Sequence, residues 1–309
     1  MALKLTHDEK GSVVGLHHGE VELFAYNYAP TYDPWESRKP YFHPVRSLAG
    51  NVVTGYRPHD HVWHKGIQMT SAHLSVPGDP VGQNFWGGNT YVHGKGYIEV
   101  DNVGRQQHEE WEKLEADGET AVLAHRLTWI TAKDVPWLAE RRSIVVGEVN
   151  EKEKRYSMDF RMVLKNMHKQ TLLFGSPTTA GRPAAGYGGL FWRGPRDFLK
   201  GSILAGNRLK GPEVMGQRAP WLAYQGKHDG SNGRTTLLFV DRPGNPDYPN
   251  KWFVRNDPFA VVSFAFSFDR EVPLEPGASM TLNHRIVVAD GTWSREQVEA
   301  YLHGAGLHD

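Results

Sequence analysis

The chain has 309 residues, and its 35 Lys and Arg residues balance its 35 Asp and Glu residues. Zero net charge argues against a nucleic-acid or membrane-surface partner, because both usually require a basic patch. The absence of cysteine excludes a disulfide framework, thiolate metal ligands and a Cys nucleophile.

The N-terminus has no apolar run of the signal-peptide type, and no segment approaches the ~20 apolar residues of a membrane helix. We therefore expect a soluble, cytoplasmic protein. A content of 33 Gly, 19 Pro and 10 Trp favours a β protein with many turns. Strand-like segments at 12–16 and 21–26 flank the turn signal His18-Gly19, which predicts a hairpin and marks 1–38 as an N-terminal β-hairpin extension.

Residues 28–40 read as irregular, and strand pieces are expected at 51–56 and 65–74. Residues 76–89 form a Gly- and Pro-rich loop whose aromatics, Phe85 and Trp86, suit a lid or a plug. Strand then follows strand from 96 to 149.

Residues 156–164 alternate apolar and polar side chains, as in a half-buried strand. Further strands are expected at 235–240, 260–268 and 279–289, and the capping-box pattern from Ser294 to Gln297 starts a short helix. The pattern predicts one all-β domain over 1–309: a large two-sheet antiparallel β-sandwich with a short C-terminal helix.

Residues 41–66 carry four of the 16 histidines, namely His43, His59, His61 and His64. Titratable groups gather at functional sites, so this segment is interpreted as one wall of a site. If the segment were a strand, His59 and His61 would share a face, and a turn would be needed to bring in His64. Those three histidines are candidate ligands of a divalent metal, since imidazole binds several such ions.

The alternative role is proton transfer by His61 or His64 beside Lys65, with Arg46 and His43 holding an oxygen-rich substrate. The conservative interpretation is that these histidines cap turns and bond to the main chain.

Two later segments add candidates. Residues 187–197 contain Arg193, whose planar guanidinium binds oxyanions. Residues 241–259 are stiffened by four prolines, and Asp241 ends a hydrophobic strand. An aromatic face together with planar hydrogen-bonding groups suits a sugar ring. The sugar-binding candidates are Trp86, Arg193, Asn245, Trp252 and Arg255.

Several motifs together resemble an uncharacterised bacterial family that is commonly labelled PmoA-like. In order they are KPYFHPVRSLAGNVVT, DHVWHKGI, NFWGG, the pair Glu140-Arg141, GGLFWR and DRPGNPDYPNKWFVRNDPF. The resemblance runs from about Lys39 to Ala289, and it implies partnership with sugar-catabolic oxidoreductases. The expected two-sheet fold also resembles the supersandwich of sugar mutarotases and polysaccharide lyases. In the mutarotase pattern His64 and Asp241 would match the acid and the sugar-holding residue.

The function expected from these residues is a carbohydrate-active enzyme that hydrolyses, eliminates or epimerises a glycoside or keto-sugar. Its catalytic candidates are His61, His64, Lys65 and Asp241. A His-ligated metalloenzyme and a non-catalytic sugar-binding accessory protein are the alternatives. The expected ligand is a small sugar or glycoside, and the oligomeric state is left open.

Overall fold

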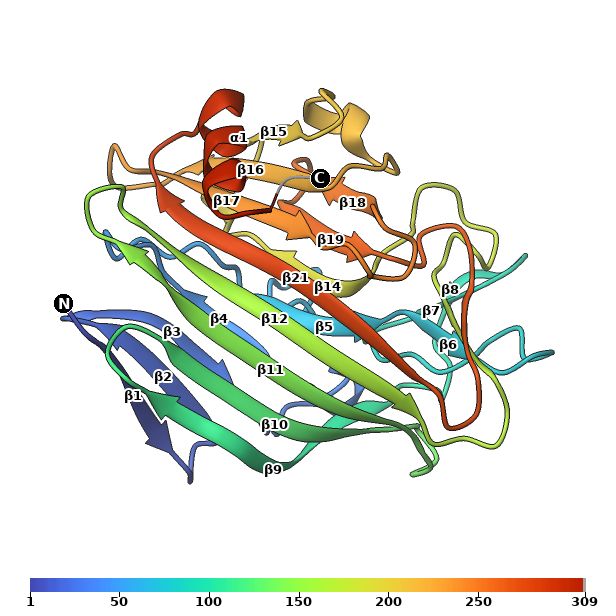
Figure 1. The fold of residues 1–309 in the computed structure, drawn as a ribbon. Coiled ribbons are helices and arrows are strands. Elements are labelled where there is room, and N and C mark those ends of the chain that lie inside the picture. Colours follow the sequence, from blue (N-terminus) through green and yellow to red (C-terminus); the bar gives the residue numbers. More distant parts are fainter. Residues whose placement is uncertain (308–309) are drawn as a thin grey trace.

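The computed structural model describes residues 1–307. Its two main sheets are antiparallel and contain eight strands each (Figure 1). The first sheet holds, in spatial order, β1 (Leu3–Asp8), β2 (Val13–His18), β3 (Val21–Asn27), β4 (Tyr41–Val45), β5 (Ile67–Ser71), β14 (Gly188–Arg193), β19 (Val261–Ala265) and β18 (Lys251–Arg255).

The second sheet lies against the first. It holds β15 (Ser202–Ala205), β16 (Trp221–Lys227), β17 (Arg234–Asp241), β21 (Ser279–Asp290), β12 (Arg155–Asn166), β11 (Pro136–Asn150), β10 (Ala121–Ile130) and β9 (Arg105–Ala116). Two smaller sheets contain β20 (Val272–Leu274), β13 (Leu172–Gly175) and β6 (His73–Ser75), and β7 (Thr90–Val92) with β8 (Gly96–Ile98). Short 3₁₀ turns are η1 (Pro34–Glu36), η2 (Arg196–Phe198) and η3 (Gly211–Val214), and the helix is α1 (Arg295–Gly304).

One hydrophobic core fills the space between the two main sheets. Phe42 of the first sheet meets Phe160 of the second at a ring distance of 5.8 Å, and Trp192 meets Phe239 at 5.6 Å. The alternating apolar residues of the predicted strand at 156–164 are buried in this core. The two-sheet antiparallel sandwich expected from the sequence is thus confirmed.

The short C-terminal helix is also confirmed. The Ser294 hydroxyl accepts the backbone N–H of Gln297, and the Gln297 side chain accepts the backbone N–H of Ser294, which closes the capping box. Val298 and Leu302 pack against the outer face of the second sheet, covering apolar side chains of β16, β17 and β21. Among residues 1–307, no helix combines the length and apolar character that crossing a bilayer requires.

The outer face of the first sheet carries its own apolar cluster. In β14, Trp192 points into the main core, whereas its neighbours Phe191 and Arg193 lie on the outer side. In β18 the same period of two buries Trp252 and leaves Phe253 for the outer cluster. This alternation decides which residues can reach a site on that face.

The histidine-rich segment before β5 differs from the expectation. Residues 51–56 contain only isolated bridges rather than a strand, and β5 begins at Ile67. Two successive turns lie between these bridges and β5. The His61 N–H donates to the Pro58 carbonyl, and the His64 N–H donates to the His61 carbonyl, each at 2.9 Å. The segment is therefore not a strand, so the face that a strand would give His59 and His61 in common is absent, and a turn places His61 next to His64.

Gly66 closes this segment by a close backbone approach. Its φ is +54°, and a Cβ at this position would stand 1.9 Å from the Phe42 carbonyl oxygen. We expect Gly66→Ala to be strongly destabilising, because the backbone must shift. Gly78→Ala is the matched control: its φ is +87° but nothing lies within 4 Å. The control should cost only the left-handed strain, about 1–2 kcal/mol. Equal losses in a urea unfolding measurement would contradict the close-approach argument.

Candidate functional site

A cavity of about 410 Å³ lies on the outer face of the first sheet. Its side chains come from η1, the histidine-rich turns, the segment from Trp86 to β8, the loop before β14, and the end of β18 with the loop that follows it. We call it the aromatic cavity, and its lining is Trp35, His61, Trp63, His64, Trp86, Gly87, Asn89, Tyr97, Arg182, Tyr187, Phe253, Arg255, Pro258 and Phe259.

His64 is buried in the cavity wall, and Arg193 sets its protonation. Arg193 Nη1 lies 3.0 Å from His64 Nδ1. A guanidinium only donates hydrogen bonds, so Nδ1 must be the acceptor and the proton must sit on Nε2. Burial, with Arg193 beside the ring, holds the His64 pKa well below its ordinary value. His64 is therefore a neutral imidazole with an N–H available to donate.

His61 has the opposite arrangement. Its Nδ1 lies 3.0 Å from the Asp60 carboxylate. Burial raises the Asp60 pKa, but the hydrogen bonds and the nearby positive charges of His61 and Arg193 together outweigh it and lower the pKa, so the carboxylate is ionised and accepts. Neutral His61 therefore carries its proton on Nδ1 and a lone pair on Nε2. Its ring stacks on His64 at 4.8 Å and 25°.

These two rings, the imidazole pair, thus present one acceptor and one donor on the same cavity. Among residues 1–307, neither Nε2 has a recorded hydrogen-bond partner. Such a pair can take a proton with one ring while the other polarises an oxygen atom.

Aromatic rings form most of the remaining wall. The ring centres of Trp86 and Tyr187 are 4.5 Å apart, and those of Tyr187 and Phe253 are 5.4 Å apart. Trp35 and Trp63 meet edge to face at 5.2 Å. Flat apolar faces of this kind suit the C–H face of a sugar ring, while the histidines and arginines supply polar contacts.

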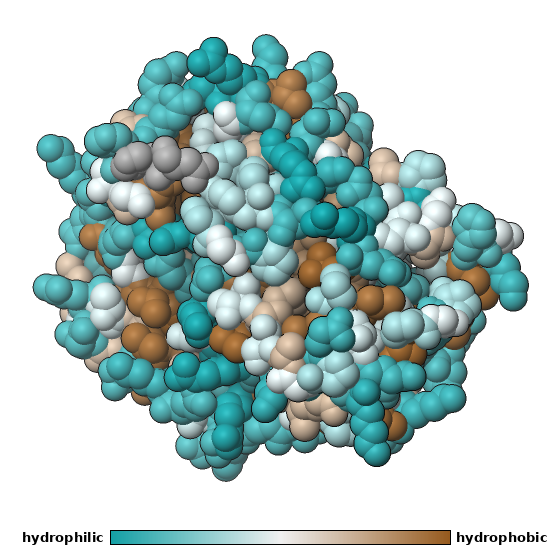
Figure 2. Space-filling model, turned by 45° about the vertical axis from the view of Figure 1, so that its right-hand side comes forward, coloured by the Kyte–Doolittle hydropathy of each residue, from teal (hydrophilic) through white to brown (hydrophobic). Residues whose placement is uncertain are grey.

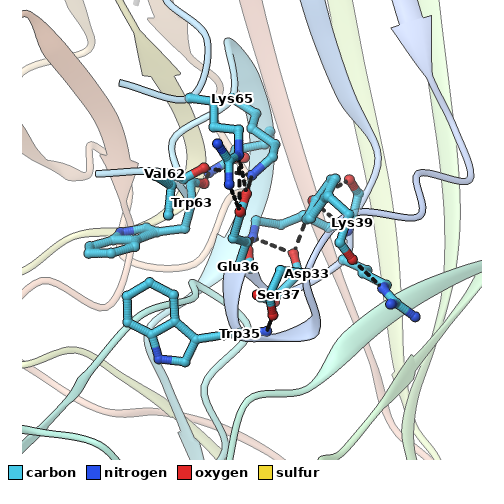
Figure 3. A network of polar contacts seen from close by, with 12 residues as sticks. Asp33, Trp35, Glu36, Ser37, Lys39, Val62, Trp63 and Lys65 are labelled. Atoms are coloured by element: carbon cyan, nitrogen blue, oxygen red, sulfur yellow. Dashed lines mark hydrogen bonds and ion pairs between the residues drawn. The ribbon is translucent and has the colours of Figure 1, made fainter. Parts of the chain in front are cut away.

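A buried ion-pair network supports the Trp35 and Trp63 side of the cavity (Figure 3). The Glu36 carboxylate accepts Lys65 Nζ at 2.5 Å and Arg57 Nη2 at 2.6 Å. Burial raises the Glu36 pKa, but the hydrogen bonds from Arg57 and Lys65 outweigh it and lower the pKa. Burial lowers the Lys65 pKa to about 8, although Glu36 opposes that shift.

Lys39 joins this wall to the loop of Trp86. Its fully buried ammonium donates to the carbonyls of Glu36 at 3.2 Å, Ser37 at 2.8 Å and Trp86 at 2.9 Å. Burial holds its pKa well below the ordinary value. Three carbonyl acceptors from two loops keep Trp35 and Trp86 in register across the cavity.

The donor set does not fit a three-histidine metal site. His59 Nδ1 faces Arg196 Nη2 at 2.9 Å, and His64 Nδ1 faces Arg193. His59 lines a separate small pocket rather than the aromatic cavity. In the described part of the chain, no three His, Asp or Glu side chains gather as metal ligands. The proposed ligation by His59, His61 and His64 is corrected on this geometry.

The structure gathers four of the sequence candidates, His61, His64, Trp86 and Arg255, on the aromatic cavity, with Arg193 directly behind His64. Lys65 is fully buried beneath the wall and does not line the cavity. The proline-stiffened loop and the histidine-rich turns therefore do border one cavity, through Pro258 and Phe259.

Five other candidates lie away from it. The Asp241 carboxylate accepts a hydrogen bond from the Asn245 side-chain amide at 2.6 Å and from the Asn250 backbone N–H at 2.8 Å. The candidates Asp241 and Asn245 therefore fix the loop after β17. Trp252 is buried in the main core and donates to the Ala219 carbonyl. Arg46 pairs with Glu22, and His43 stacks on Tyr56.

Sequence reasoning missed Trp35, Trp63, Tyr187, Phe253 and Arg182. One signal was available for Phe253: in KWFVR the period of two puts Phe253 and Arg255 together, opposite Trp252. Trp35 lies in the short 3₁₀ turn η1 and Arg182 in a loop, and no periodicity encodes the positions of such segments.

A larger recess of about 1100 Å³ lies between α1 and the ends of β11 and β21. Several of its charged groups already have ion-pair partners: Arg155 pairs with Glu153, and Glu148 pairs with Arg285. It contains no histidine in its lining. The aromatic cavity is the better candidate because its polar groups are left for a ligand.

The model of a family of unknown function, DUF6807, matches residues 13–303. The chain belongs to this family. The PmoA-like label stays a prediction. No curated protein matches the sequence.

Solved structures give weak similarities. The α-galactosidase from Lactobacillus brevis is 9% identical with a TM-score of 0.45, covering 95% of this chain and 41% of that one. The galactosidase domain of the α-galactosidase–sucrose kinase AgaSK is 10% identical with a TM-score of 0.43, covering 93% and 42%. Galactose 1-epimerase from Lactobacillus acidophilus NCFM is 8% identical with a TM-score of 0.37, covering 94% and 99%. The chain spans less than half of the two galactosidase chains, and TM-scores below 0.5 carry no argument about its activity.

Stability should fall on mild acidification, before the carboxylates titrate. Burial lowers the pKa of His43 to about 4, and lowers those of His64 and His125 well below 6.5. The unfolded chain binds protons that the folded chain cannot, so stability present above pH 6.5 is lost as the pH falls towards 4. Urea unfolding at about pH 7.5 and about pH 5 measures this. A free energy of unfolding that does not change would contradict it, and His43→Gln should reduce the loss.

Glu36→Gln should destabilise the protein by about 3–5 kcal/mol, because it leaves Lys65 buried without a counter-charge. Glu22→Gln, at the more exposed pair with Arg46, is the matched control and should cost about 0–1 kcal/mol. The double variant Glu36→Leu with Lys65→Met should lose less than Glu36→Gln alone. Equal urea midpoints for Glu36→Gln and Glu22→Gln would show that the network does not support the wall.

Proposed function

We propose that this member of DUF6807 is a carbohydrate-active enzyme that transfers a proton at a carbon next to a carbonyl group. Its substrate is an oxidised sugar or keto-glycoside, and the product is an epimer or an eliminated, unsaturated sugar. The observation that carries the proposal is the imidazole pair: two stacked rings in one cavity whose partners impose opposite hydrogen-bond roles.

In the first step His61 Nε2 takes the proton from the carbon adjacent to the carbonyl. The electron pair of that C–H bond forms the C=C bond of an enolate, and the carbonyl pair moves onto oxygen. The His64 N–H donates to this developing oxyanion, where a preorganised donor stabilises charge most. Neutral His64 fits this role, since an imidazole that keeps its proton can polarise the oxygen at neutral pH.

The next step of the enolate then decides which product forms. Water gives a proton to the opposite face of the carbon, and the hydroxide that results takes the proton from His61, which yields the epimer. Departure of a β substituent with its bonding pair gives the unsaturated sugar, and water later removes the proton from His61. Asp60 orients His61 and stabilises the imidazolium that forms.

Glycoside hydrolysis by two carboxylates is not supported. That chemistry requires a pair of Asp or Glu side chains on either side of the bond. The residues that line the aromatic cavity include no Asp or Glu, and Asp60 is engaged by His61. Proton transfer by imidazole uses the groups that are present.

The sugar specificity rests on the aromatic wall. Trp86, Tyr187 and Phe253 form a continuous set of ring contacts, with Trp35 and Trp63 as a second pair. Rings of this kind bury the apolar face of a sugar, and Asn89 and the arginines meet its hydroxyls.

The test is solvent exchange. The protein is incubated in deuterium oxide with neutral and acidic sugars and with 3-keto-glycosides, and deuterium incorporation is followed by proton NMR. His61→Asn and His64→Phe should each slow exchange by about 10²–10⁴-fold. His59→Ala is the matched control, since its side chain lies outside the cavity. Exchange that is equal in wild type and His61→Asn would remove the imidazole pair from the reaction.

Binding without any exchange or turnover would instead identify a non-catalytic sugar-binding protein. In that case a sugar would raise the unfolding temperature of wild type and of His61→Asn alike.

A further inference from the structure

The lining of the aromatic cavity carries a net positive charge. Its ionisable lining consists of His61, His64, Arg182, Arg255 and the phenols of two tyrosines, and it includes no carboxylate. His64 is neutral because Arg193 donates to it. Only the two guanidiniums then carry a permanent charge, and a low-dielectric cleft concentrates their field.

Arg255 is half-buried at the end of β18 and lacks an ion-pair partner among residues 1–307. Its guanidinium carbon lies 5.5 Å from the centre of the Phe253 ring, on the same side of the strand. Arginines near this loop behave differently, since Arg218 and Arg270 both pair with Asp247. A partly desolvated charge is usually paired, so an unpaired one lining a cavity indicates a missing anion.

Arg182 reaches the same cavity from the loop between β13 and β14. It donates to the Tyr97 hydroxyl and lies over that ring at 4.7 Å. Tyr97 in turn bonds to the Tyr187 hydroxyl at 2.7 Å. These contacts hold the guanidinium in place without neutralising it, and the described residues offer it no carboxylate.

We propose that the ligand of the aromatic cavity is a carbohydrate bearing an anionic group, a carboxylate or a phosphate, which Arg255 and Arg182 bind. This inference rests on the proposed function only in taking the ligand to be a sugar. A guanidinium matches either oxyanion through two parallel N–H donors, while the aromatic wall covers the sugar face.

The volume of the aromatic cavity suits a small ligand. On the face shown in Figure 2, hydrophobic side chains occur as separate small patches among hydrophilic ones. A protein partner would require a broader continuous surface, whereas a cavity of about 410 Å³ is within the range of small-molecule sites.

Isothermal titration of the full chain tests the proposal. The probes are D-glucuronate, D-gluconate and D-glucose 6-phosphate, with D-glucose and methyl glucoside as their neutral counterparts. Wild type should bind at least one acidic probe about tenfold or more tighter than the neutral ones, and added salt should weaken that binding. Arg255→Met and Arg182→Met should each weaken it about 10- to 100-fold, a larger loss than either variant causes for the neutral sugars.

Two further variants serve as controls. Arg255→Lys keeps the charge without the planar fork, so it should retain part of the selectivity. Arg234→Met makes the same change of net charge at an exposed position of β17 in the other sheet, and it should leave binding unchanged. Circular dichroism establishes that each variant is folded.

The outcomes separate the two proposals. Selectivity for glucuronate and gluconate assigns a carboxylate, and selectivity for the phosphorylated sugar assigns a phosphate. Equal binding of acidic and neutral sugars, or selectivity that survives in both Arg→Met variants, overturns the anion site alone. Acidic sugars that bind but show no deuterium exchange overturn the reaction and leave the anion site standing. If no sugar of either kind binds, both proposals fail.

Discussion

The buried ion pair between Glu36 and Lys65 holds together the parts of the chain that form the aromatic cavity. Glu36 belongs to the 3₁₀ turn that carries Trp35, and Lys65 directly follows His64. Removing two charges from water is costly, and only close geometry with further hydrogen bonds offsets it. Arg57 and the Val62 carbonyl supply those bonds. The stability of the fold and the geometry of the candidate site therefore depend on the same few atoms.

The position of the cavity also depends on what covers the outer face of each sheet. The inner face of the first sheet is committed to the core, and α1 covers part of the outer face of the second. At the aromatic cavity the outer face of the first sheet is bordered by loops, η1 and β8, so aromatic side chains there surround a space. Phe191 and Arg193 of β14 both lie on this outer face and have different roles. One packs beneath the cavity, and the other sets the tautomer of His64.

Electrostatics links the two proposals. Arg193 keeps His64 neutral, and the unpaired Arg182 and Arg255 give the cavity a positive field. A positive field stabilises an enolate oxygen as well as a carboxylate or phosphate on the substrate. A cavity built in this way is suited to anions formed or bound next to apolar walls.

The sequence by itself determined the layered β architecture and the helix at 295–304 with its cap, and it singled out the histidine-rich segment as a candidate wall of a site. Periodicity and capping are local properties, so they can be recognised without contacts. Alternation also contained the information that Phe253 and Arg255 share a face, although Trp252 was the more conspicuous residue. Tertiary structure alone decided that His61 stacks on His64 while His59 turns away, and that Asp241 fixes a loop. It alone brought Glu36, Arg182 and Arg193 to the site, because turns and loops place side chains through contacts between residues far apart in the chain.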